Sequence, residues 1–305
     1  MGLGERLTEL DRRLAGLGSV LVAFSGGADS AFLLARAARM LGADRVAAAT
    51  AVSASLPAAE REAAGRFAAG LAVIWVAPET DELNRPGYRE NGATRCFFCK
   101  AELLDVLAPL ATRLGLAWVA TGTNADDAVA GFRPGIRAAA ERGAATPLLD
   151  AGLTKADVRA ASRAMGLSTW DKPAAACLSS RIAYGVPVTP ARLARVERAE
   201  VALRVALAAA GLPARDLRVR DLGPAGARVE VDAALVQALD RRPDLLEAVQ
   251  GFDRVVLDPR GFRSGSLNDA LPTAGGEAAG ERDAAGRGSR RRDGANPLGL
   301  LGTGD

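Results

Sequence analysis

Three cysteines are the side chains whose type and spacing first suggest chemistry in this chain of 305 residues. Cys96 and Cys99 form a C-x-x-C pair in the run "RCFFCK", and Cys177 follows much later in "ACLSSR". The chain contains no histidine, which excludes imidazole acid–base catalysis and histidine-ligated zinc. Any reaction must therefore use thiols, carboxylates, cations or backbone amides.

Three thiols of this spacing are compatible with several kinds of site. A C-x-x-C pair occurs in redox disulfides, in zinc sites and in iron–sulfur clusters. A structural zinc ion prefers four sulfur or nitrogen ligands, and this chain offers three. Three thiolates suit a 4Fe–4S cluster with one iron left open for a non-protein ligand, as a sulfur carrier requires. We therefore expect Cys96, Cys99 and Cys177 to ligate such a cluster, with zinc, a redox disulfide or free thiols as alternatives.

A glycine-rich loop is the strongest sign of a binding site. The run "FSGGADS", residues 24–30, joins an expected strand to an expected helix. Gly26 and Gly27 allow the backbone to approach a phosphate, and the amino terminus of the helix presents free amides to an anion. The hydroxyls of Ser25 and Ser30 can donate hydrogen bonds, and Asp29 is the expected partner of Mg²⁺. The alternative is a plain glycine-rich turn, since the run matches neither the Walker loop nor the dinucleotide fingerprint.

The basic residues are nearly all arginine, and the only lysines are Lys100, Lys155 and Lys172. A lysine kept in such a chain can serve where a compact, titratable ammonium is needed. Lys100 adjoins the C-x-x-C pair, and Lys172 lies shortly before Cys177. We expect Lys100 to take part in catalysis, whereas Lys155 is equally well a surface residue.

Composition limits the class of protein. An apolar fraction of 49% and a charged fraction of 25% are ordinary for a globular protein, and no apolar run is long enough to span a bilayer. The amino terminus lacks the apolar core of a signal peptide, and an odd, low cysteine count fits a reducing compartment. We therefore expect a cytoplasmic protein without a membrane partner. Much of the net charge of +3 comes from an arginine-rich tail, so we expect no nucleic-acid partner.

Short apolar runs alternate with helical patterns through the first half of the chain. Strands are expected in "VLVAFSGG", "RVAAATAVS", "LAVIWVAP" and "LAWVATGTN", with helices such as "SAFLLARAARML" between them. This alternation predicts an α/β fold with a doubly wound parallel sheet. Thr154 with Asp157, and Thr189 with Pro190, indicate where two further helices begin.

The pattern changes after "WDKP". The runs "LRVRDL" and "ARVEVD" alternate like two strands joined by "GPAG", and a helix through residues 233–249 leads to a strand in "RVVLD". We predict three parts. Residues 1–172 form the α/β domain, residues 173–269 form a small α+β domain for substrate binding or oligomerisation, and residues 270–305 form a disordered tail rich in Gly, Ala and Arg.

Charged side chains alternate along the two strands of the second domain. Arg218 and Arg220 share one face of their strand, with Leu217 and Val219 on the other. Glu230 has the same alternating position in the next strand. Paired arginines on one face suit a clamp for phosphate or carboxylate, so we expect these three charged residues to bind substrate. A solvated outer face of the sheet is the alternative.

The glycine-rich loop resembles the PP-loop of the ATP pyrophosphatases, which cut ATP between the α and β phosphates and transfer AMP to an oxygen of the substrate. The resemblance implies ATP and Mg²⁺ as cofactors. It also implies that the run "TGTNADD" completes the site, with Gly122 against the nucleotide and Asn124, Asp126 and Asp127 serving metal and phosphate. Helix capping is the alternative for the two aspartates.

A longer series of motifs follows in order between about residue 20 and residue 269: "RCFFCK", "GTNADD", "RPG", "TPLLDAGLTKADVR", "WDKPAAACLSSRIAYG", "RVR", "ARVEV" and "LDPRGFRSGSLN". The series is similar to the LarE family of sulfur transferases, which build the nickel-pincer nucleotide. The family implies a small nucleotide substrate, pyridinium-3,5-dicarboxylate mononucleotide. Its carboxylate attacks the α-phosphate of ATP, and a sulfur nucleophile then displaces AMP and leaves a thiocarboxylate. A PP-loop tRNA thiolation enzyme is the alternative, although the chain lacks the further cysteines and aromatic-rich basic surface of such enzymes.

The LarE family divides by the source of its sulfur. In single-cysteine members, the cysteine that corresponds to Cys177 is sacrificed and becomes dehydroalanine. Members with an additional C-x-x-C pair resemble cluster enzymes, in which three cysteines hold a 4Fe–4S cluster with an extra sulfide. Cys96, Cys99 and Cys177 make this chain similar to the second type, with a sacrificial Cys177 as the alternative.

The resemblance also implies residues for the substrate. Ser180 and Arg181 follow Cys177 directly and are expected to hold the substrate phosphate near the sulfur. Glu200 is expected to contribute a carboxylate to the same site, although helical amphipathicity explains this residue almost as well. The family further implies a homo-oligomer, and it does not identify the donor that reloads the sulfur.

Overall fold

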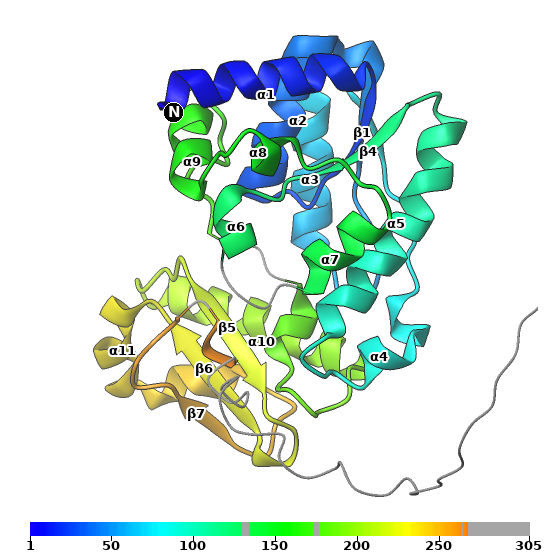
Figure 1. Cartoon of the computed structure of the whole chain (residues 1–305). Helices are drawn as coiled ribbons and strands as arrows, with labels where there is room; N and C mark the ends of the chain where they lie inside the picture. Colours follow the sequence, from blue (N-terminus) through cyan, green and yellow to red (C-terminus); the bar gives the residue numbers. More distant parts are fainter. Residues whose placement is uncertain (130–133, 174–176, 264, 268–305) are drawn as a thin grey trace, which may run out of the picture. The chain divides into compact units, whose positions relative to one another are not determined.

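A parallel sheet of four strands forms the centre of the first half of the chain (Figure 1). The computed structural model describes residues 1–129, 134–173, 177–263 and 265–267. The strand order is β3-β2-β1-β4, and all three pairings are parallel. The strands are β1 (Val20–Ala23), β2 (Val46–Ala49), β3 (Ile74–Val76) and β4 (Trp118–Thr121).

Helices cover both faces of this sheet, and β1 is therefore buried on both sides. Val20 and Val22 pack into a large apolar core with α1 (Leu3–Leu17), α2 (Ala28–Leu41), α3 (Ala58–Gly70) and α9 (Lys155–Ala164). Leu21 and Ala23 point the other way and pack against α5 (Arg95–Arg113). Successive side chains of a strand face opposite sides, so the short run "VLVA" serves two helical layers. The predicted doubly wound α/β fold is confirmed.

The strand order reverses between β1 and β4. The chain moves outward from β1 through β2 to β3 and then returns to place β4 on the other side of β1. Open parallel sheets bind ligands in the crevice outside the carboxyl ends of the strands at such a switch point. The glycine-rich loop follows β1 and the run "TGTNADD" includes the end of β4, so both predicted binding segments meet at this crevice.

The predicted helix starts are confirmed. Thr154 forms a capping box with Asp157 at the start of α9, and the Thr189 side chain accepts a hydrogen bond from the amide of Arg192 in α10 (Pro190–Ala209). The remaining helices of the described residues are α4 (Pro86–Arg89), α6 (Ala125–Val129), α7 (Pro134–Glu141), α8 (Pro147–Asp150) and α11 (Ala233–Asp240), with short 3-10 turns η1 (Ala43–Arg45), η2 (Glu82–Asn84), η3 (Leu178–Arg181), η4 (Gly223–Ala225) and η5 (Pro243–Ala248).

A second sheet of three strands lies in the order β5-β6-β7. Strands β5 (Leu217–Asp221) and β6 (Ala227–Val231) are antiparallel as predicted, and β7 (Val255–Leu257) is parallel to β6. The prediction of one helix through residues 233–249 is wrong. The helix α11 ends at Asp240 and η5 follows, because Pro243 has no backbone N–H and clashes with the preceding helical turn.

The predicted division of the chain into three parts stays a prediction. Residues 1–271 form one compact unit that contains both sheets, so the boundary between residues 172 and 173 remains a prediction. The predicted tail, residues 270–305, lies outside the described residues. No helix in the described ranges is long and apolar enough to cross a membrane.

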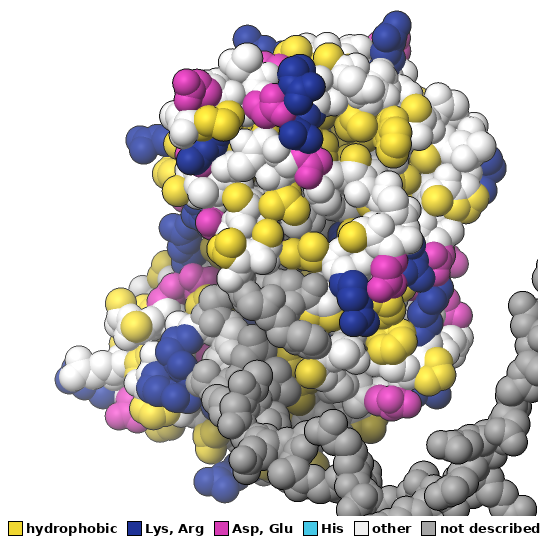
Figure 2. Space-filling model, viewed as in Figure 1, with side chains coloured by type: hydrophobic (Ala, Val, Ile, Leu, Met, Phe, Trp, Pro, Cys, Tyr) yellow, Lys and Arg dark blue, Asp and Glu magenta, His cyan; other side chains and the backbone are white. Residues whose placement is uncertain are grey.

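Basic and acidic side chains are interspersed over the face of the molecule in Figure 2. Ion pairs on the helices of the first sheet contribute to this mixture, such as Arg12 with Glu9 in α1 and Arg36 of α2 with Asp11. Charges of both signs are thus neighbours on the described surface of these helices.

Replacing Gly122 with alanine is expected to destabilise the fold. A Cβ atom at residue 122 would lie 2.8 Å from the amide nitrogen of Ser30 and 3.0 Å from the carbonyl carbon of Asp29. Backbone atoms cannot rotate away, so Gly122→Ala must separate the end of β4 from α2. We expect a loss of about 1–3 kcal/mol in the free energy of unfolding, measured by urea denaturation. Gly70→Ala is the control, because a Cβ at residue 70 meets nothing within 4 Å. Equal midpoints for the two variants would contradict the prediction.

Candidate active site

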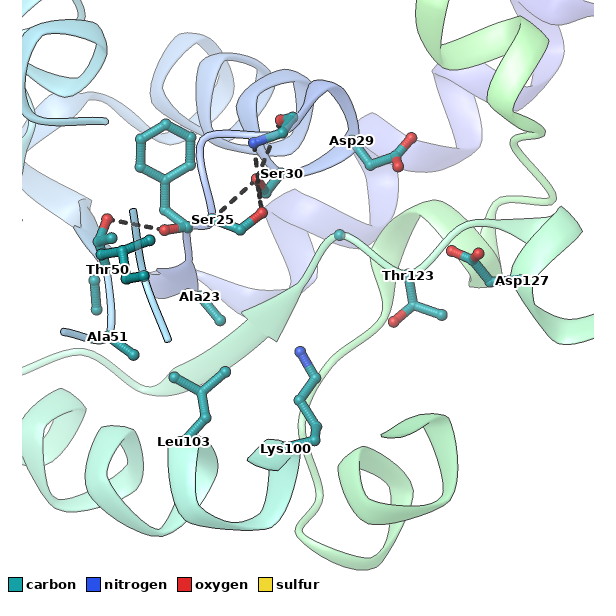
Figure 3. A pocket seen from close by; sticks show the side chains of 15 residues that line it. Ala23, Ser25, Asp29, Ser30, Thr50, Ala51, Lys100, Leu103, Thr123 and Asp127 are labelled. Atoms are coloured by element: carbon teal, nitrogen blue, oxygen red, sulfur yellow. Dashed lines mark hydrogen bonds between the residues drawn. The ribbon is translucent and has the colours of Figure 1, made fainter. Parts of the chain in front are cut away.

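A pocket of about 300 Å³ opens at the carboxyl ends of β1 and β4 (Figure 3). The loop after β1 forms one wall, the turn after β4 forms another, and α5 contributes Lys100 and Leu103. Figure 3 shows the Lys100 side chain pointing into the pocket, with Asp29 and Asp127 beside one another at one end. The lining residues are Ala23, Phe24, Ser25, Gly27, Asp29, Ser30, Ala49, Thr50, Ala51, Leu56, Lys100, Leu103, Gly122, Thr123 and Asp127.

Hydrogen bonds around Ser30 hold the glycine-rich loop in shape. The Ser30 hydroxyl donates to the Gly27 carbonyl at 3.2 Å, accepts from the Ser25 amide at 3.3 Å and lies 3.1 Å from the Ser25 hydroxyl. Gly26 has a φ of 72°, in the left-handed region that glycine adopts most readily. Gly27 is the N-cap of α2 and has no side chain to satisfy the amides of the first turn. The loop therefore presents helix amides to the pocket, as an anion site requires.

Two carboxylates, those of Asp29 and Asp127, lie beside one another at one end of the pocket. Burial and the nearby Asp127 carboxylate raise the pKa of Asp29, and Lys155 only partly offsets them. Such a pair is a natural site for a divalent cation. The described residues contain no group of three or more Asp, Glu, Cys or His side chains that could hold a metal ion. A Mg²⁺ ion at Asp29 would thus take its other ligands from phosphate oxygens and water, as Mg²⁺ does in nucleotide sites.

The structure gives the remaining residues of "TGTNADD" different roles. Gly122 lines the pocket and packs against the first turn of α2. Asn124 and Asp127 form reciprocal side-chain to backbone hydrogen bonds at the start of α6, of 3.1 and 3.3 Å. Asp126 accepts from the backbone amide of Lys155 at 2.8 Å and so anchors α9. Both aspartates therefore have the structural partners that helix capping predicts, and only Asp127 also lines the pocket.

All three lysines lie at or beside this pocket. Lys155 pairs with Asp127 at 3.4 Å. Lys172 donates to the Gly26 carbonyl at 3.0 Å and to Glu60 at 2.7 Å, so it fixes the back of the loop. Burial lowers the pKa of Lys100, and the neighbouring Cys99 thiol opposes this shift. Lys100 thus connects the pocket to the thiols.

The fold brings the three cysteines into one region. Cys96 and Cys99 lie at the start of α5, and Cys177 directly precedes η3. Cys99 packs against an apolar cluster that contains Tyr88 and Leu178, the residue after Cys177. Burial raises the pKa of Cys99 strongly, and the Cys177 thiol is the next largest cause. Cys99 therefore packs beside the residue that follows Cys177, although the described residues contain no group of three or more Cys, His, Asp or Glu side chains placed to hold a metal ion.

Sequence reasoning missed four residues around the thiols. Tyr88, Asn91 and Arg95 come from α4, the following turn and α5, and each is at most 6% exposed. Burial acts to lower the pKa of Arg95, but the Cys177 and Cys96 thiols raise it overall. Arg95 could have been suspected, because it directly precedes Cys96. The fourth missed residue is the buried Glu82, which accepts hydrogen bonds from the Ser53 and Ser55 hydroxyls.

A larger cavity of about 760 Å³ collects several residues predicted to bind substrate. Arg181 donates to Glu200 at 2.9 Å, and burial together with Arg181 lowers the pKa of Arg218 to about 10. Lys172 lines this cavity and also donates to the Gly26 carbonyl, so the cavity adjoins the glycine-rich loop. The lining residues are Pro57, Ala58, Ala59, Glu60, Glu62, Lys172, Pro173, Leu178, Arg181, Glu197, Arg198, Glu200, Val201, Ala202, Arg204, Arg215 and Arg218.

The other predicted substrate residues have protein partners. Arg220 and Glu230 form a buried pair at 2.7 Å, and the Ser266 hydroxyl donates to Glu230 at 2.8 Å. The Ser180 hydroxyl donates to the Cys177 carbonyl at 2.7 Å. Arg218 and Arg220 are 7% and 5% exposed, so the alternative of a solvated sheet face is wrong. Their binding of substrate stays a prediction.

The fold and the pocket define a class: α/β proteins with a doubly wound parallel sheet and a glycine-rich anion loop at its switch point. No protein-family model matches the chain. Pyridinium-3,5-bisthiocarboxylic acid mononucleotide synthase of Lactiplantibacillus plantarum is 34% identical over 276 residues, which cover 89% of this chain and 97% of that protein. The chain belongs to the family of this synthase, the LarE family.

Two uncharacterized proteins are also similar to the chain. One from Synechocystis is 40% identical over 274 residues, 88% of this chain and 99% of that protein. One from Methanocaldococcus jannaschii is 25% identical over 177 residues, 57% of this chain and 66% of that protein. The similarity to the first relative thus extends over most of both chains.

Asp29→Asn is expected to raise the thermal unfolding midpoint at neutral pH. The raised pKa of Asp29 means that the folded state favours the protonated carboxyl over the ionised one. As the pH rises through the folded pKa, the carboxyl ionises and the folded state becomes less stable. We expect a gain of about 2–4 °C at pH 7, the shift that ~1 kcal/mol produces. The gain should shrink as the pH falls through the raised folded pKa of Asp29 and vanish below about 4, where the unfolded carboxyl is also protonated. Asp240→Asn, at an exposed position at the end of α11, is the control. If the unfolding midpoint rises equally in both variants, or rises by the same amount at every pH, the charge of Asp29 does not destabilise the fold.

Arg220→Ala is expected to destabilise the protein strongly. The change leaves the fully buried Glu230 without its closest cation, although Arg228 remains at 3.2 Å. Breaking one side of a buried pair costs about 3–5 kcal/mol, whereas an exposed pair contributes about 0–1 kcal/mol. Arg242→Ala, which removes an exposed pair with Asp244, is therefore the matched control in urea denaturation. Similar losses in both variants would show that the buried pair is dispensable.

Proposed function

We propose that this chain is an ATP-dependent sulfur transferase that converts a carboxylate of pyridinium-3,5-dicarboxylate mononucleotide into a thiocarboxylate, in nickel-pincer cofactor biosynthesis. The observation that supports the proposal most directly is that α5 contributes residues to two neighbouring sites. Its Lys100 lines the pocket at the glycine-rich loop, while Cys99, one residue earlier, packs beside the segment of Cys177. A site for activating a carboxylate thus adjoins a site for delivering sulfur. The name of the Lactiplantibacillus plantarum relative supports the product.

The pocket suits the first step, transfer of AMP. The substrate carboxylate attacks the α-phosphorus of ATP, the bond to the bridging oxygen breaks, and pyrophosphate leaves. The loop amides and the hydroxyls of Ser25 and Ser30 would hold the phosphates. Asp29 and Asp127 would bind Mg²⁺, which neutralises charge on the leaving group. Lys100 would stabilise charge on the transferring phosphoryl group from the opposite wall.

The larger cavity suits the substrate. A mononucleotide with two carboxylates is an anion, and the cavity presents Lys172, Arg181 and Arg218. Lys172 also reaches the loop carbonyl of Gly26, so a substrate held here would place its carboxylate near the α-phosphate. The guanidinium groups suit bidentate binding of phosphate and carboxylate. Adenylation then turns one carboxylate oxygen into a good leaving group for attack by sulfur.

The thiols suit a sulfur donor. Cys96, Cys99 and Cys177 supply the three-thiolate donor set that a 4Fe–4S cluster with one open iron requires, and the raised pKa of Cys99 would be reversed by coordination to a metal. Such a cluster would supply sulfide bound at its open iron. Arg95 would stabilise thiolate charge at Cys96 and Cys177. A sacrificial Cys177 remains the alternative source, and a homo-oligomer remains a prediction.

Variants of the two sites are expected to separate the two steps. Cys177→Ala should lower thiocarboxylate formation by about 10³-fold or more, with pyrophosphate release retained. Asp29→Ala should lower pyrophosphate release itself by about 10²–10³-fold. Both products are measured after mixing with ATP, Mg²⁺ and the mononucleotide. Asp126→Asn is the control for the pocket, because Asp126 is bonded to the amide of Lys155. Loss of pyrophosphate release in Cys177→Ala would contradict two separate sites.

Iron content distinguishes the two sulfur sources. After anaerobic reconstitution, the cluster hypothesis expects about four irons per chain, lost in each of Cys96→Ala, Cys99→Ala and Cys177→Ala. Full turnover in Cys96→Ala and Cys99→Ala would leave Cys177 as the sole donor. The mass of Cys177 after one turnover would then show a missing sulfur atom.

A further inference from the structure

Asn91, between α4 and α5, has an unusual backbone and a fully buried side chain. Its φ is 58°, in the left-handed region that residues with a Cβ rarely adopt, and its exposure is 0%. Asparagine is among the few residues that tolerate this conformation. Backbone strain of this kind persists only where surrounding contacts enforce it, and it often marks a functional constraint.

Four of the contacts of Asn91 come from the segment after Cys177. The Asn91 amide donates to the carbonyls of Ala183 and Val186, each at 2.8 Å, and to that of Ile182 at 3.3 Å. The Asn91 carbonyl accepts from the amide of Gly185 at 3.2 Å. One residue thus closes the turn of residues 182–186 from a distance of about ninety positions in the chain.

The same residue is linked to the C-x-x-C helix. The Asn91 side-chain oxygen accepts from Arg95, the first residue of α5, at 2.5 Å. The same guanidinium nitrogen donates to the Ser179 carbonyl at 2.8 Å. The Tyr88 hydroxyl lies 2.5 Å from the Ser179 hydroxyl and completes the contact. Tyr88, Asn91 and Arg95, which we call the bracket, therefore tie η3 to the start of α5.

We propose that Asn91 is a positioning residue that sets the distance between Cys177 and the C-x-x-C pair. The two thiol-bearing segments lie far apart in the sequence, and Asn91 bonds to the turn after Cys177 and to the residue before Cys96 at once. The proposal rests on the proposed function for its catalytic meaning, because a cluster that delivers sulfur needs all three thiols together. Its geometric content holds for either source of sulfur.

The chemistry of the side chain explains the choice of asparagine. The position needs donors for backbone carbonyls, an acceptor for Arg95, and tolerance of positive φ. Aspartate would keep the acceptor for Arg95 but would turn a carboxylate oxygen toward the three carbonyl oxygens. Glycine would tolerate the positive φ but would lose both the side-chain donor and the side-chain acceptor. Asn91→Gly is therefore the sharper variant, since it removes the bonds without adding backbone strain.

The first test measures the distance between thiols directly. In a Cys96→Ala background, dibromobimane bridges Cys99 and Cys177 only when they are neighbours, and the bridged product is fluorescent. We expect efficient bridging when Asn91 is present and a several-fold lower yield in Asn91→Gly. Asn84→Ala is the control, because Asn84 is exposed in η2 and bonds to Asp81 and Arg89. Equal yields in the Asn91→Gly and Asn84→Ala backgrounds would overturn the proposal.

The second test uses the chain with all three cysteines. Asn91→Gly is expected to lower the kcat of thiocarboxylate formation by about 10²-fold, the scale of a displacement of roughly 1 Å, and to leave pyrophosphate release and the KM for ATP unchanged. A merely structural defect would lower both products together and would overturn the proposal. If Asn91→Gly does not fold, Tyr88→Phe, which removes one hydroxyl of the bracket, provides the same two readouts. The two proposals can also fail separately. If even the natural chain forms no thiocarboxylate, the proposed function is rejected. The positioning role is still supported in that case if Asn91→Gly lowers the yield of bridging.

Discussion

The close approach of two backbone segments at the switch point is the constraint on which the site depends. Strand β1 pairs with β2 and β4 in parallel register, so the loop before α2 and the turn after β4 emerge at the same edge. They meet so closely that a Cβ on Gly122 would overlap the backbone at Ser30. This packing brings Asp29 and Asp127 beside one another, and the charge of Asp127 is part of the reason why the pKa of Asp29 is raised.

Buried charged groups in this protein differ in how well their surroundings stabilise the charged form. The carboxylate of Asp221 is fully buried, and Arg192 and Arg195 hold its pKa below the usual range against the effect of burial. By contrast, burial raises the pKa of Asp29 and lowers that of Lys100. Groups destabilised in this way gain most from a bound ligand of opposite charge. The contrast separates a structural ion pair from the two charged residues of the pocket to which the proposed function gives a ligand.

Parts of the site could be predicted from the sequence because they are local. The run "FSGGADS" contains its own glycines, hydroxyls and carboxylate, and its place between a strand and a helix follows from periodicity. Other parts could not. Arg218 and Arg220 share a strand face, yet Arg218 lines the large cavity while Arg220 pairs with Glu230. Alternation gives the face of a residue but not what covers that face, because the cover comes from distant segments.

The sequence by itself determined the α/β order, the glycine-rich loop and the spacing of the C-x-x-C pair, because these depend on neighbours within a few residues. Only the tertiary structure decided that Cys177 returns to that pair and that Asn91, Arg95 and Tyr88 hold it there. Those contacts join residues 88–95 to residues 179–186, and no local pattern encodes them. Asn91 shows the physical reason. An asparagine in a polar stretch of sequence is typical of an exposed loop, and only contacts with residues distant in the sequence bury it and give its side-chain amide hydrogen-bond partners.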